Sequence, residues 1–365
     1  MTGNQPTHGN PRRWLPWAVS GAALVVGGVI GGVIVSATST SAAVASPPAQ
    51  VSACEVTPVA NEVMPSMVTI SVHAKGGGGT GSGEVIQSGG YILTNNHVIA
   101  SAANGGSVEV LFSDGQTAPA TIVGRDPQTD LAVIKADTSA KLKVIAMGTS
   151  SSLQVGDPDV VIGAPLGLSG TVTSGIVSAL NRDVQVPGEN DANALLVGAV
   201  QTDAAINPGN SGGAMVNCSG QLIGVPSAGA TVPTSSGEPS AGGSIGLGFA
   251  IPVDLAKTIS DEIISTGSVT HAYFGLQAVP LPTAAAEQGG VPEGLYVEAV
   301  VPGSPAAQAG LRAGDVITKV NGQPATSTVQ LQVLTLTKKP GDTVPLEYWR
   351  GGHTASTTVT LGKQP

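Results

Sequence analysis

The 365-residue sequence has few aromatic residues, little charge and almost no cysteine. Phe, Trp and Tyr together make up 3% of the chain, so a folded core must be built from Val, Ile, Leu and Ala. Charged residues make up 11%, and 15 basic against 24 acidic residues give a net charge of −9. This balance argues against a nucleic-acid-binding protein, which needs a basic face to displace phosphate counterions.

The two cysteines, Cys54 and Cys218, also limit the chemistry. They are too few for a zinc cage or an iron–sulfur site, and the sequence has no CxxC redox motif. No cluster of metal ligands is visible, and we expect neither a metal nor another cofactor. With 41% hydrophobic residues, 51 Gly and 26 Pro, the chain is long enough for about two globular domains.

The N-terminal segment predicts the compartment. A polar tail, residues 1–13, ends in Arg12 and Arg13, and an almost wholly apolar stretch follows up to Val35. As a helix, residues 14–35 would span a membrane, and the positive-inside rule would place the following residues outside the cytoplasm. The rival interpretation is a cleaved signal peptide, because Ala43-Val44-Ala45 is similar to an A-x-A cleavage site. Either way, we expect the rest of the chain to be extracytoplasmic.

Composition divides the rest of the chain into a linker and two domains. Residues 36–54 are rich in Ala, Ser, Thr and Pro and predict a stalk. Residues 55–266 contain short β-branched runs between glycine turns, followed by an amphipathic helix predicted over Val253–Ile264. Residues 271–362 predict a second, smaller domain with strands and a helix near Thr328–Leu336. The chain is therefore expected to be mainly β. Examples of the runs that predict strands in the first domain are Met67–Val72, Glu84–Ile86, Tyr91–Thr94, Val108–Phe112, Leu131–Lys135, Val160–Ile162, Gly175–Leu180 and Gln221–Val225.

Three segments of the first domain together predict a serine protease. They centre on His97 after a predicted strand, Asp130 at the mouth of another, and Ser211 in a glycine-rich turn. Each alone has an ordinary structural explanation. Together, in the chain order His, Asp, Ser within an all-β domain, they match the triad order of chymotrypsin-like barrels. The neutral imidazole of His97 would take the proton of Ser211, and Asp130 would orient that imidazole.

Longer motifs resemble one protease family. TNNHVI at 94–99, DLAVIK at 130–135 and TDAAINPGNSGG at 202–213 are similar to motifs of the HtrA/DegP family of trypsin-like serine proteases, especially its membrane-anchored actinobacterial, PepD-type members. The resemblance covers roughly residues 60–360. It implies a chymotrypsin-like double β-barrel followed by a PDZ domain. It also implies that Gly209, Asn210 and Ser211 form the oxyanion hole, and that the protein assembles as a homotrimer.

The residues around Ser211 predict the substrate preference. In trypsin-like barrels the pocket is lined by residues just before the serine and by the strand after it. We therefore expect Ala205, Ile206, Val225 and Ser227 to line it. None of these is acidic, so the pocket should prefer a small aliphatic side chain before the cut. Pro226, which lacks an N–H, departs from the family pattern.

The second domain has a motif for binding carboxylates. Tyr273-Phe274-Gly275-Leu276 is similar to the carboxylate-binding loop of protease-linked PDZ domains. The N–H groups of Phe274, Gly275 and Leu276 could receive a C-terminal carboxylate, with the peptide adding as a strand beside residues 275–279. The alternative is a domain that only packs on the protease.

Two further features allow two interpretations each. Outside the cytoplasm, Cys54 and Cys218 can form a disulfide or remain buried free thiols. Gly76, Gly78 and Gly81 form a G-x-G-x-x-G match, but a nucleotide site would need a helix next, and strand-like residues follow.

The sequence as a whole predicts an anchored serine endopeptidase that degrades unfolded or damaged proteins and senses C-terminal peptides. The alternative is a chaperone or PDZ-based binding protein with a latent protease site. Residues 228–244 and 185–194 are the loops expected to act as the switch between latent and active states.

Overall fold

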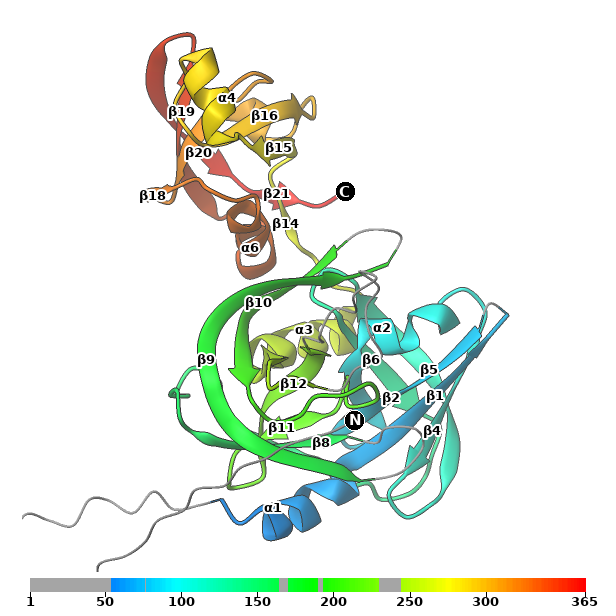
Figure 1. Ribbon diagram of the computed structural model, residues 1–365. Coiled ribbons are helices and arrows are strands. Elements are labelled where there is room, and N and C mark those ends of the chain that lie inside the picture. The colour runs from blue at the N-terminus through cyan, green and yellow to red at the C-terminus, as the bar shows by residue number, and fades with distance from the viewer. Residues whose placement is uncertain (1–53, 76, 164–169, 190–192, 230–243) are drawn as a thin grey trace, which may run out of the picture. The chain divides into compact units, whose positions relative to one another are not determined.

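The computed structural model describes residues 54–365 apart from 76, 164–169, 190–192 and 230–243. The predicted anchor over residues 14–35 and most of the stalk lie outside this part. Within the part described, no helix is long and apolar enough to cross a membrane. The predicted mainly β fold is confirmed, because most of the elements are strands (Figure 1).

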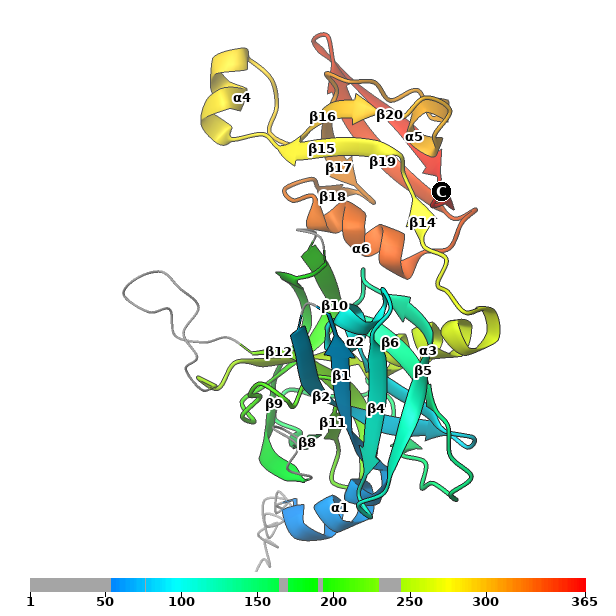
Figure 2. The same cartoon turned by 90° about the vertical axis from the view of Figure 1, so that its right-hand side faces the viewer.

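The first barrel is closed by six antiparallel strands in the order β1-β2-β3-β6-β5-β4. Its interior is filled by aliphatic side chains such as Ile70, Ile92 and Val110, all fully buried. Figure 2 shows β1, β4 and β5 running side by side along this barrel. The strands are β1 (Met67–Ala74), β2 (Gly77–Gln87), β3 (Tyr91–Asn95), β4 (Ser107–Phe112), β5 (Thr117–Asp126) and β6 (Leu131–Ala136).

The second barrel follows the strand order β11-β8-β9-β10-β13-β12, and β12 pairs with β11 to close it. The long strand β9 curves around one side (Figure 1), and the short β7 pairs with β12. The strands are β7 (Ala146–Met147), β8 (Pro158–Gly163), β9 (Thr171–Pro187), β10 (Asn193–Thr202), β11 (Ala214–Val216), β12 (Gln221–Gly229) and β13 (Gly248–Pro252).

Short helices accompany the barrels. An apolar core formed by both barrels includes Leu131, Val160 and Ile251, and α1 and α3 contribute Val59 and Ile263 to it. The predicted helix over Val253–Ile264 is α3, which ends in the left-handed Gly267. The helices are α1 (Val56–Val63), η1 (Met64–Ser66), α2 (Asn96–Ile99), η2 (Ala100–Ala102) and α3 (Val253–Thr266).

The C-terminal domain has its own core, which includes Leu295, Ile317 and Val344. Its main sheet has the order β15-β16-β17-β19-β20, with β18 paired to β17, while β14 and β21 form a separate two-stranded sheet. The helix predicted near Thr328–Leu336 is α6. The elements are β14 (Ala272–Tyr273), β15 (Leu276–Pro280), α4 (Thr283–Gly289), β16 (Leu295–Val300), α5 (Pro305–Gln308), β17 (Val316–Val320), β18 (Gln323–Pro324), α6 (Val329–Thr337), β19 (Thr343–Arg350), β20 (His353–Thr360) and β21 (Gly362–Lys363).

Candidate active site

His97 and Asp130 are in direct contact. His97 lies on α2, immediately after β3, and Asp130 ends the turn between β5 and β6. The ring Nδ1 of His97 lies 2.8 Å from Oδ2 and 3.1 Å from Oδ1 of Asp130, and its backbone N–H donates to Oδ1 at 3.0 Å. A carboxylate can only accept, so Nδ1 carries the proton. This tautomer leaves Nε2 free to act as a base.

Asp130 has a left-handed backbone conformation, with a φ of 58°. Such a conformation costs a non-glycine residue of order 1–3 kcal/mol and persists only where the surroundings impose it. Its carbonyl oxygen accepts from the Asn95 side chain at 2.9 Å and from the Asn96 N–H at 3.1 Å. Its side chain is 4% exposed, against 41% for that of His97. The carboxylate is therefore fixed, whereas the imidazole faces the solvent.

Ser227 completes the shell around the Asp130 carboxylate. Its hydroxyl donates to Oδ2 at 2.5 Å, and both groups are buried. Ser227 is predicted from the sequence to line the substrate pocket, but its side chain lies beside Asp130 instead. Val225 likewise misses the pocket, because it is fully buried in the core formed by both barrels. Val225 and Ser227 are two residues apart on β12, but a register irregularity between Pro226 and Ala228 interrupts the alternation of side chains there.

Ser211 lies in the turn between β10 and β11, which is held tightly. The Ser82 N–H donates to its carbonyl oxygen at 3.0 Å. The next residue, Gly212, has a φ of 75° and packs so closely on Thr94 and Ser82 that no side chain fits there. The Ser211 hydroxyl donates to the Ser227 carbonyl oxygen at 3.3 Å. Within the described part of the chain, it makes no hydrogen bond with His97.

The predicted oxyanion residues divide into two groups. Gly209 and Ser211 line the same cleft as His97. Gly209 has a φ of 100°, and its carbonyl oxygen accepts from the Ser82 hydroxyl at 2.6 Å. Asn210 is fully buried, its N–H donates to the Asn207 carbonyl oxygen, and its amide reaches the Ala205 carbonyl oxygen at 3.3 Å. In this conformation Asn210 braces the turn, and its N–H is not directed at the cleft.

The cleft beside Ser211 has a volume of about 370 Å³. Of the four predicted pocket residues, Ile206 lines it, whereas Ala205 uses its carbonyl oxygen to accept from Thr173. None of the described residues that line the cleft is acidic. Most of the other lining residues are not predicted from the sequence, because their position depends on the closure of the barrels and on no local motif. The lining residues are Gly79, Thr80, His97, Val98, Ile206, Asn207, Pro208, Gly209, Ser211, Gly229 and Ser244.

Two carboxyl groups in the barrels, those of Asp159 and Glu84, have raised pKa values. Burial raises the pKa of the Asp159 carboxyl to about 6, and the neighbouring Asp203 adds to this. The opposing influence is the Thr202 hydroxyl, which donates to Asp159 Oδ2 at 2.8 Å and accepts from the Ala204 N–H. Burial alone raises the pKa of Glu84 well above its usual value. Neither carboxyl lines the cleft.

The predicted carboxylate loop precedes an edge strand. Gly275 has a φ of 75° and contacts the Ser304 side chain, whose hydroxyl donates to the Gly275 carbonyl oxygen at 3.0 Å. The Ala306 N–H donates to the carbonyl oxygen of the buried Phe274 at 2.9 Å. From Leu276 onward the chain forms β15, which pairs only with β16 in its sheet. An edge strand of this kind can accept an added peptide strand.

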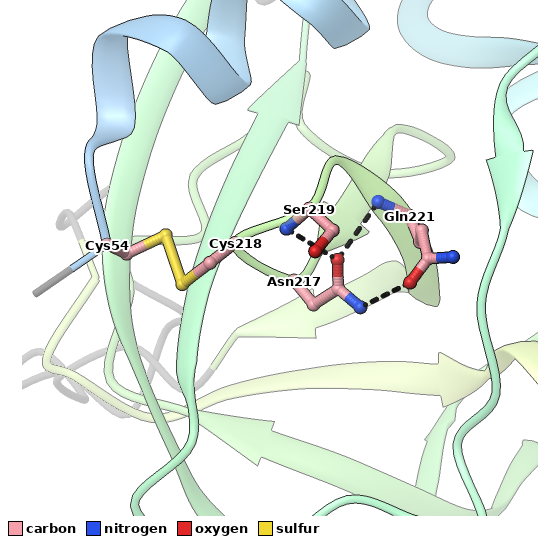
Figure 3. The surroundings of a disulfide bond; sticks show 5 residues. All are labelled: Cys54, Asn217, Cys218, Ser219 and Gln221. Carbon is pink, nitrogen blue, oxygen red and sulfur yellow. Dashed lines mark hydrogen bonds between the residues drawn. A yellow bond between two sulfur atoms is a disulfide. The ribbon is translucent and has the colours of Figure 1, made fainter. Parts of the chain in front are cut away.

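Cys54 and Cys218 form a disulfide in the structure, with their Cα atoms 5.3 Å apart (Figure 3). Cys218 lies in the turn between β11 and β12. The side chain of Asn217 braces this turn, because its Oδ1 accepts from the N–H groups of Ser219 and Gln221 (Figure 3). The disulfide therefore joins the start of the described chain to the hairpin that follows Ser211.

Cofactor sites are not evident in the described residues. No three His, Cys, Asp or Glu side chains there are placed to hold a metal ion. Gly78 and Gly81 of the G-x-G-x-x-G match lie in β2, which pairs antiparallel with β1 and β3. The helix that a dinucleotide site would require does not follow this match.

Comparison with known proteins agrees with this geometry. Residues 81–225 match a trypsin-like peptidase domain and residues 268–361 match a PDZ domain. The chain is 45% identical over 330 residues to the serine protease PepD of Mycobacterium tuberculosis, an alignment that covers 88% of this chain and 69% of PepD. A solved structure of the HtrA-type protease AlgW with a decapeptide has a TM-score of 0.67 and 32% identity, covering 85% of this chain and 99% of that one. The chain belongs to the HtrA-type serine proteases.

Other similar proteins are also named as serine endoproteases. The periplasmic pH-dependent serine endoprotease DegQ of Escherichia coli is 40% identical over 287 residues, which are 78% of this chain and 59% of DegQ. The serine endoprotease of Yersinia pestis has a TM-score of 0.63 and 33% identity, with 85% of this chain and 98% of that chain covered. This HtrA-type protease thus shares its fold with proteins named as endoproteases.

Proposed function

We propose that this HtrA-type protease hydrolyses unfolded or damaged proteins outside the cytoplasm through a Ser-His-Asp triad. The observation that carries the proposal is the bond from His97 Nδ1 to the buried Asp130, with Ser211 lining the same cleft. His97 Nε2 takes the proton of the Ser211 hydroxyl as its oxygen attacks the peptide carbonyl. His97 then gives this proton to the leaving amine, and water releases the acyl group by the same steps.

The oxyanion of each tetrahedral intermediate is assigned to the N–H groups of Gly209 and Ser211. Both residues line the cleft, and neither N–H donates a hydrogen bond within the described part of the chain. One such donor is worth about 3 kcal/mol of transition-state stabilisation. A slight rotation of the Ser211 hydroxyl away from the Ser227 carbonyl oxygen would direct it toward His97.

Small aliphatic side chains are the proposed preference before the cut. Ile206 lines the cleft and packs against Gly248, where an added side chain would meet the isoleucine. An apolar wall without an acidic residue disfavours Lys and Arg. Ile206→Ala should therefore move cleavage toward larger apolar residues such as Leu and Met while leaving the reaction of Ser211 with a small fluorophosphonate unchanged.

Peptide binding by the C-terminal domain is the proposed means of regulation. The loop formed by Phe274, Gly275 and Leu276 would bind a C-terminal carboxylate, and the peptide would extend β15. AlgW, whose solved structures contain a decapeptide or a tripeptide, supports this assignment. We further propose that residues 14–35 anchor the chain in the membrane and that the protease forms a homotrimer.

A chaperone or PDZ-based binding protein with a latent protease site is the second candidate. It is favoured by one observation, the hydrogen bond that directs the Ser211 hydroxyl to the Ser227 carbonyl oxygen. The proposed switch loops lie partly outside the described residues, at 190–192 and 230–243. Glu189, beside the first gap, accepts from Asn96 at 3.0 Å, next to His97.

The experiment compares digestion of reduced casein by the full-length chain in detergent with digestion by its Ser211→Ala variant. Ser219→Ala, an exposed serine in the β11–β12 turn, is the matched control. Cuts after Val or Ala that disappear only in Ser211→Ala support the proposal. Cuts after Lys or Arg contradict the specificity, and protection of casein from aggregation without any cleavage favours the chaperone.

A further inference from the structure

The turn that carries Asp130 is held at its start by Asp126. This residue ends β5, and its side chain is 3% exposed. Its Oδ2 accepts from the Thr129 hydroxyl at 2.5 Å, and its Oδ1 accepts from the Gln128 N–H at 3.2 Å. The Asp126 carboxylate thus organises the residues that lead directly to the left-handed Asp130. Any group that fixes Asp126 also fixes this turn.

His271 is that group, although it lies 145 residues further along the chain. Its Nε2 donates to Asp126 Oδ1 at 2.9 Å, and its side chain is 6% exposed. His271 immediately precedes β14, the first strand of the C-terminal domain. Gln364, just after β21, donates its N–H to the His271 carbonyl oxygen at 3.1 Å and accepts from the Gln128 side chain at 2.8 Å.

The path from α3 to His271 is also fixed. Gly124 on β5 approaches the Gly267 carbonyl oxygen and Ile263 so closely that no side chain fits at position 124. The Glu262 carboxylate accepts from the Thr270 N–H at 2.8 Å. His271 is therefore brought to Asp126 by a connection with little freedom, and both residues that flank the β14–β21 sheet contact the turn before Asp130.

We propose that His271 is a positioning residue for catalysis, which acts through Asp126 on the turn that keeps Asp130 in its left-handed conformation. A conformation that costs free energy is retained only while its surroundings impose it. When the His271–Asp126 bond is lost, Asp130 relaxes and no longer holds His97 in the reactive orientation. This inference rests on the proposed triad and extends its regulation.

The position of His271 links the His271–Asp126 bond to the proposed peptide-binding loop. His271 is followed by the two residues of β14 and then by the loop formed by Phe274, Gly275 and Leu276. A peptide that binds this loop and displaces β14 would alter the His271–Asp126 bond, and through it the turnover rate. Communication along this route needs no loop outside the described residues.

The test compares the full-length chain with three variants. His271→Ala removes the donor, His271→Gln keeps an N–H donor near the position of Nε2, and His353→Ala changes an exposed histidine on β20. We measure kcat and KM on a short Val-containing peptide, together with the thermal unfolding temperature. We also record the low-field NMR resonance of the proton between His97 and Asp130, which needs no substrate.

We expect His271→Ala to lower kcat by about tenfold or more with KM little changed, because a displaced catalytic group costs rate and not affinity. The low-field resonance should shift or broaden. His271→Gln should restore both, and His353→Ala should match the wild type. Asp126→Ala also removes the acceptor of the Thr129 hydroxyl and of the Gln128 N–H, so it should lower kcat at least as much as His271→Ala. Because the two residues share one link, the losses in the double variant should be less than additive.

Three outcomes would overturn the inference: an unchanged kcat in His271→Ala, a change in KM alone, or a rate loss that His271→Gln does not reverse. If His271→Ala fails to fold, the inference is tested by comparing His271→Gln with Asp126→Asn. Each of these variants keeps the approximate shape of the side chain that it replaces and one group able to form the hydrogen bond. A wild-type chain that cleaves nothing would contradict the proposed function, while the NMR resonance would still test the positioning role.

Discussion

The hydroxyl of Ser227 donates to Oδ2 of Asp130 at 2.5 Å across a sequence separation of 97 residues. The same oxygen lies 2.8 Å from His97 Nδ1, so it accepts both from Ser227 on β12 of the second barrel and from the imidazole of the proposed general base. The bond between Ser227 and Asp130 joins the two barrels at the proposed triad. It fixes the orientation of the Asp130 carboxylate toward the His97 ring.

Removing this donor should slow catalysis. We expect Ser227→Ala to lower kcat by about tenfold, since a hydrogen bond to a charged group is worth about 1.5–3 kcal/mol. Ser227→Thr, which keeps the hydroxyl, should retain most of the rate. The measurement is kcat on a peptide substrate with the unfolding temperature as reference.

Ser66→Ala provides the control for that measurement. Ser66 is also buried, and its hydroxyl has no hydrogen-bond partner in the described part of the chain. Its loss should leave kcat unchanged. Equal rate losses in Ser66→Ala and Ser227→Ala would show that the effect is a general loosening of the barrels.

The strands were predictable because their pattern is local. Each sequence run expected as a strand lies in one, and α3 and α6 occur within two residues of the expected ranges. His97, Asp130 and Ser211 could likewise be found from short motifs. The contact of His97 with Asp130 then follows from β3 and β6 being neighbours, since Asn95 pairs with Leu131.

The contacts across the barrels could not be predicted in this way. Whether Ser227 faces the pocket or Asp130 depends on the orientation of β12, and a register irregularity between Pro226 and Ala228 alters it locally. The bond between His271 and Asp126 depends on the path of the chain after α3. Neither residue type nor spacing encodes such long-range pairs.

The raised pKa of Asp159 should make stability depend on pH. Its pKa is about 6 in the folded protein against 3.8 for an ordinary Asp, so the folded state binds the proton more tightly than the unfolded chain. The destabilisation of the folded state by the ionised Asp159 carboxylate is therefore absent below about pH 4 and complete above about pH 6. It amounts to about 3 kcal/mol.

Asp159→Asn removes that titration while keeping an oxygen for the Thr202 hydroxyl. The variant should gain stability relative to the wild type as the pH rises from 4 to 7. Urea unfolding is followed by circular dichroism. Asp137→Asn, an exposed control, should show no such gain. A constant difference across this pH range would contradict the prediction.

Glu84 should destabilise the first barrel at neutral pH. It is fully buried on β2, and neither carboxylate oxygen has a hydrogen-bond partner among the described residues. Glu84→Met, which fills a similar volume, should raise the free energy of unfolding by roughly 2 kcal/mol at pH 7. Glu109→Met, at an exposed position on β4, is the matched control. A lower stability for Glu84→Met would indicate that the carboxyl has a structural partner.

The Cys54–Cys218 disulfide should contribute more to stability than any single side chain discussed above. It closes a loop with a sequence separation of 164, and restricting an unfolded chain over such a length is worth about 5 kcal/mol in the chain-entropy account. The double variant Cys54→Ser with Cys218→Ser should therefore unfold at a clearly lower urea concentration. Treating the wild type with dithiothreitol should reproduce the shift, whereas the double variant should not respond to the reductant. If reduction leaves the wild-type midpoint in place, α1 and the β11–β12 hairpin are held together by the packing of Val63 against Gly220 without the help of the disulfide.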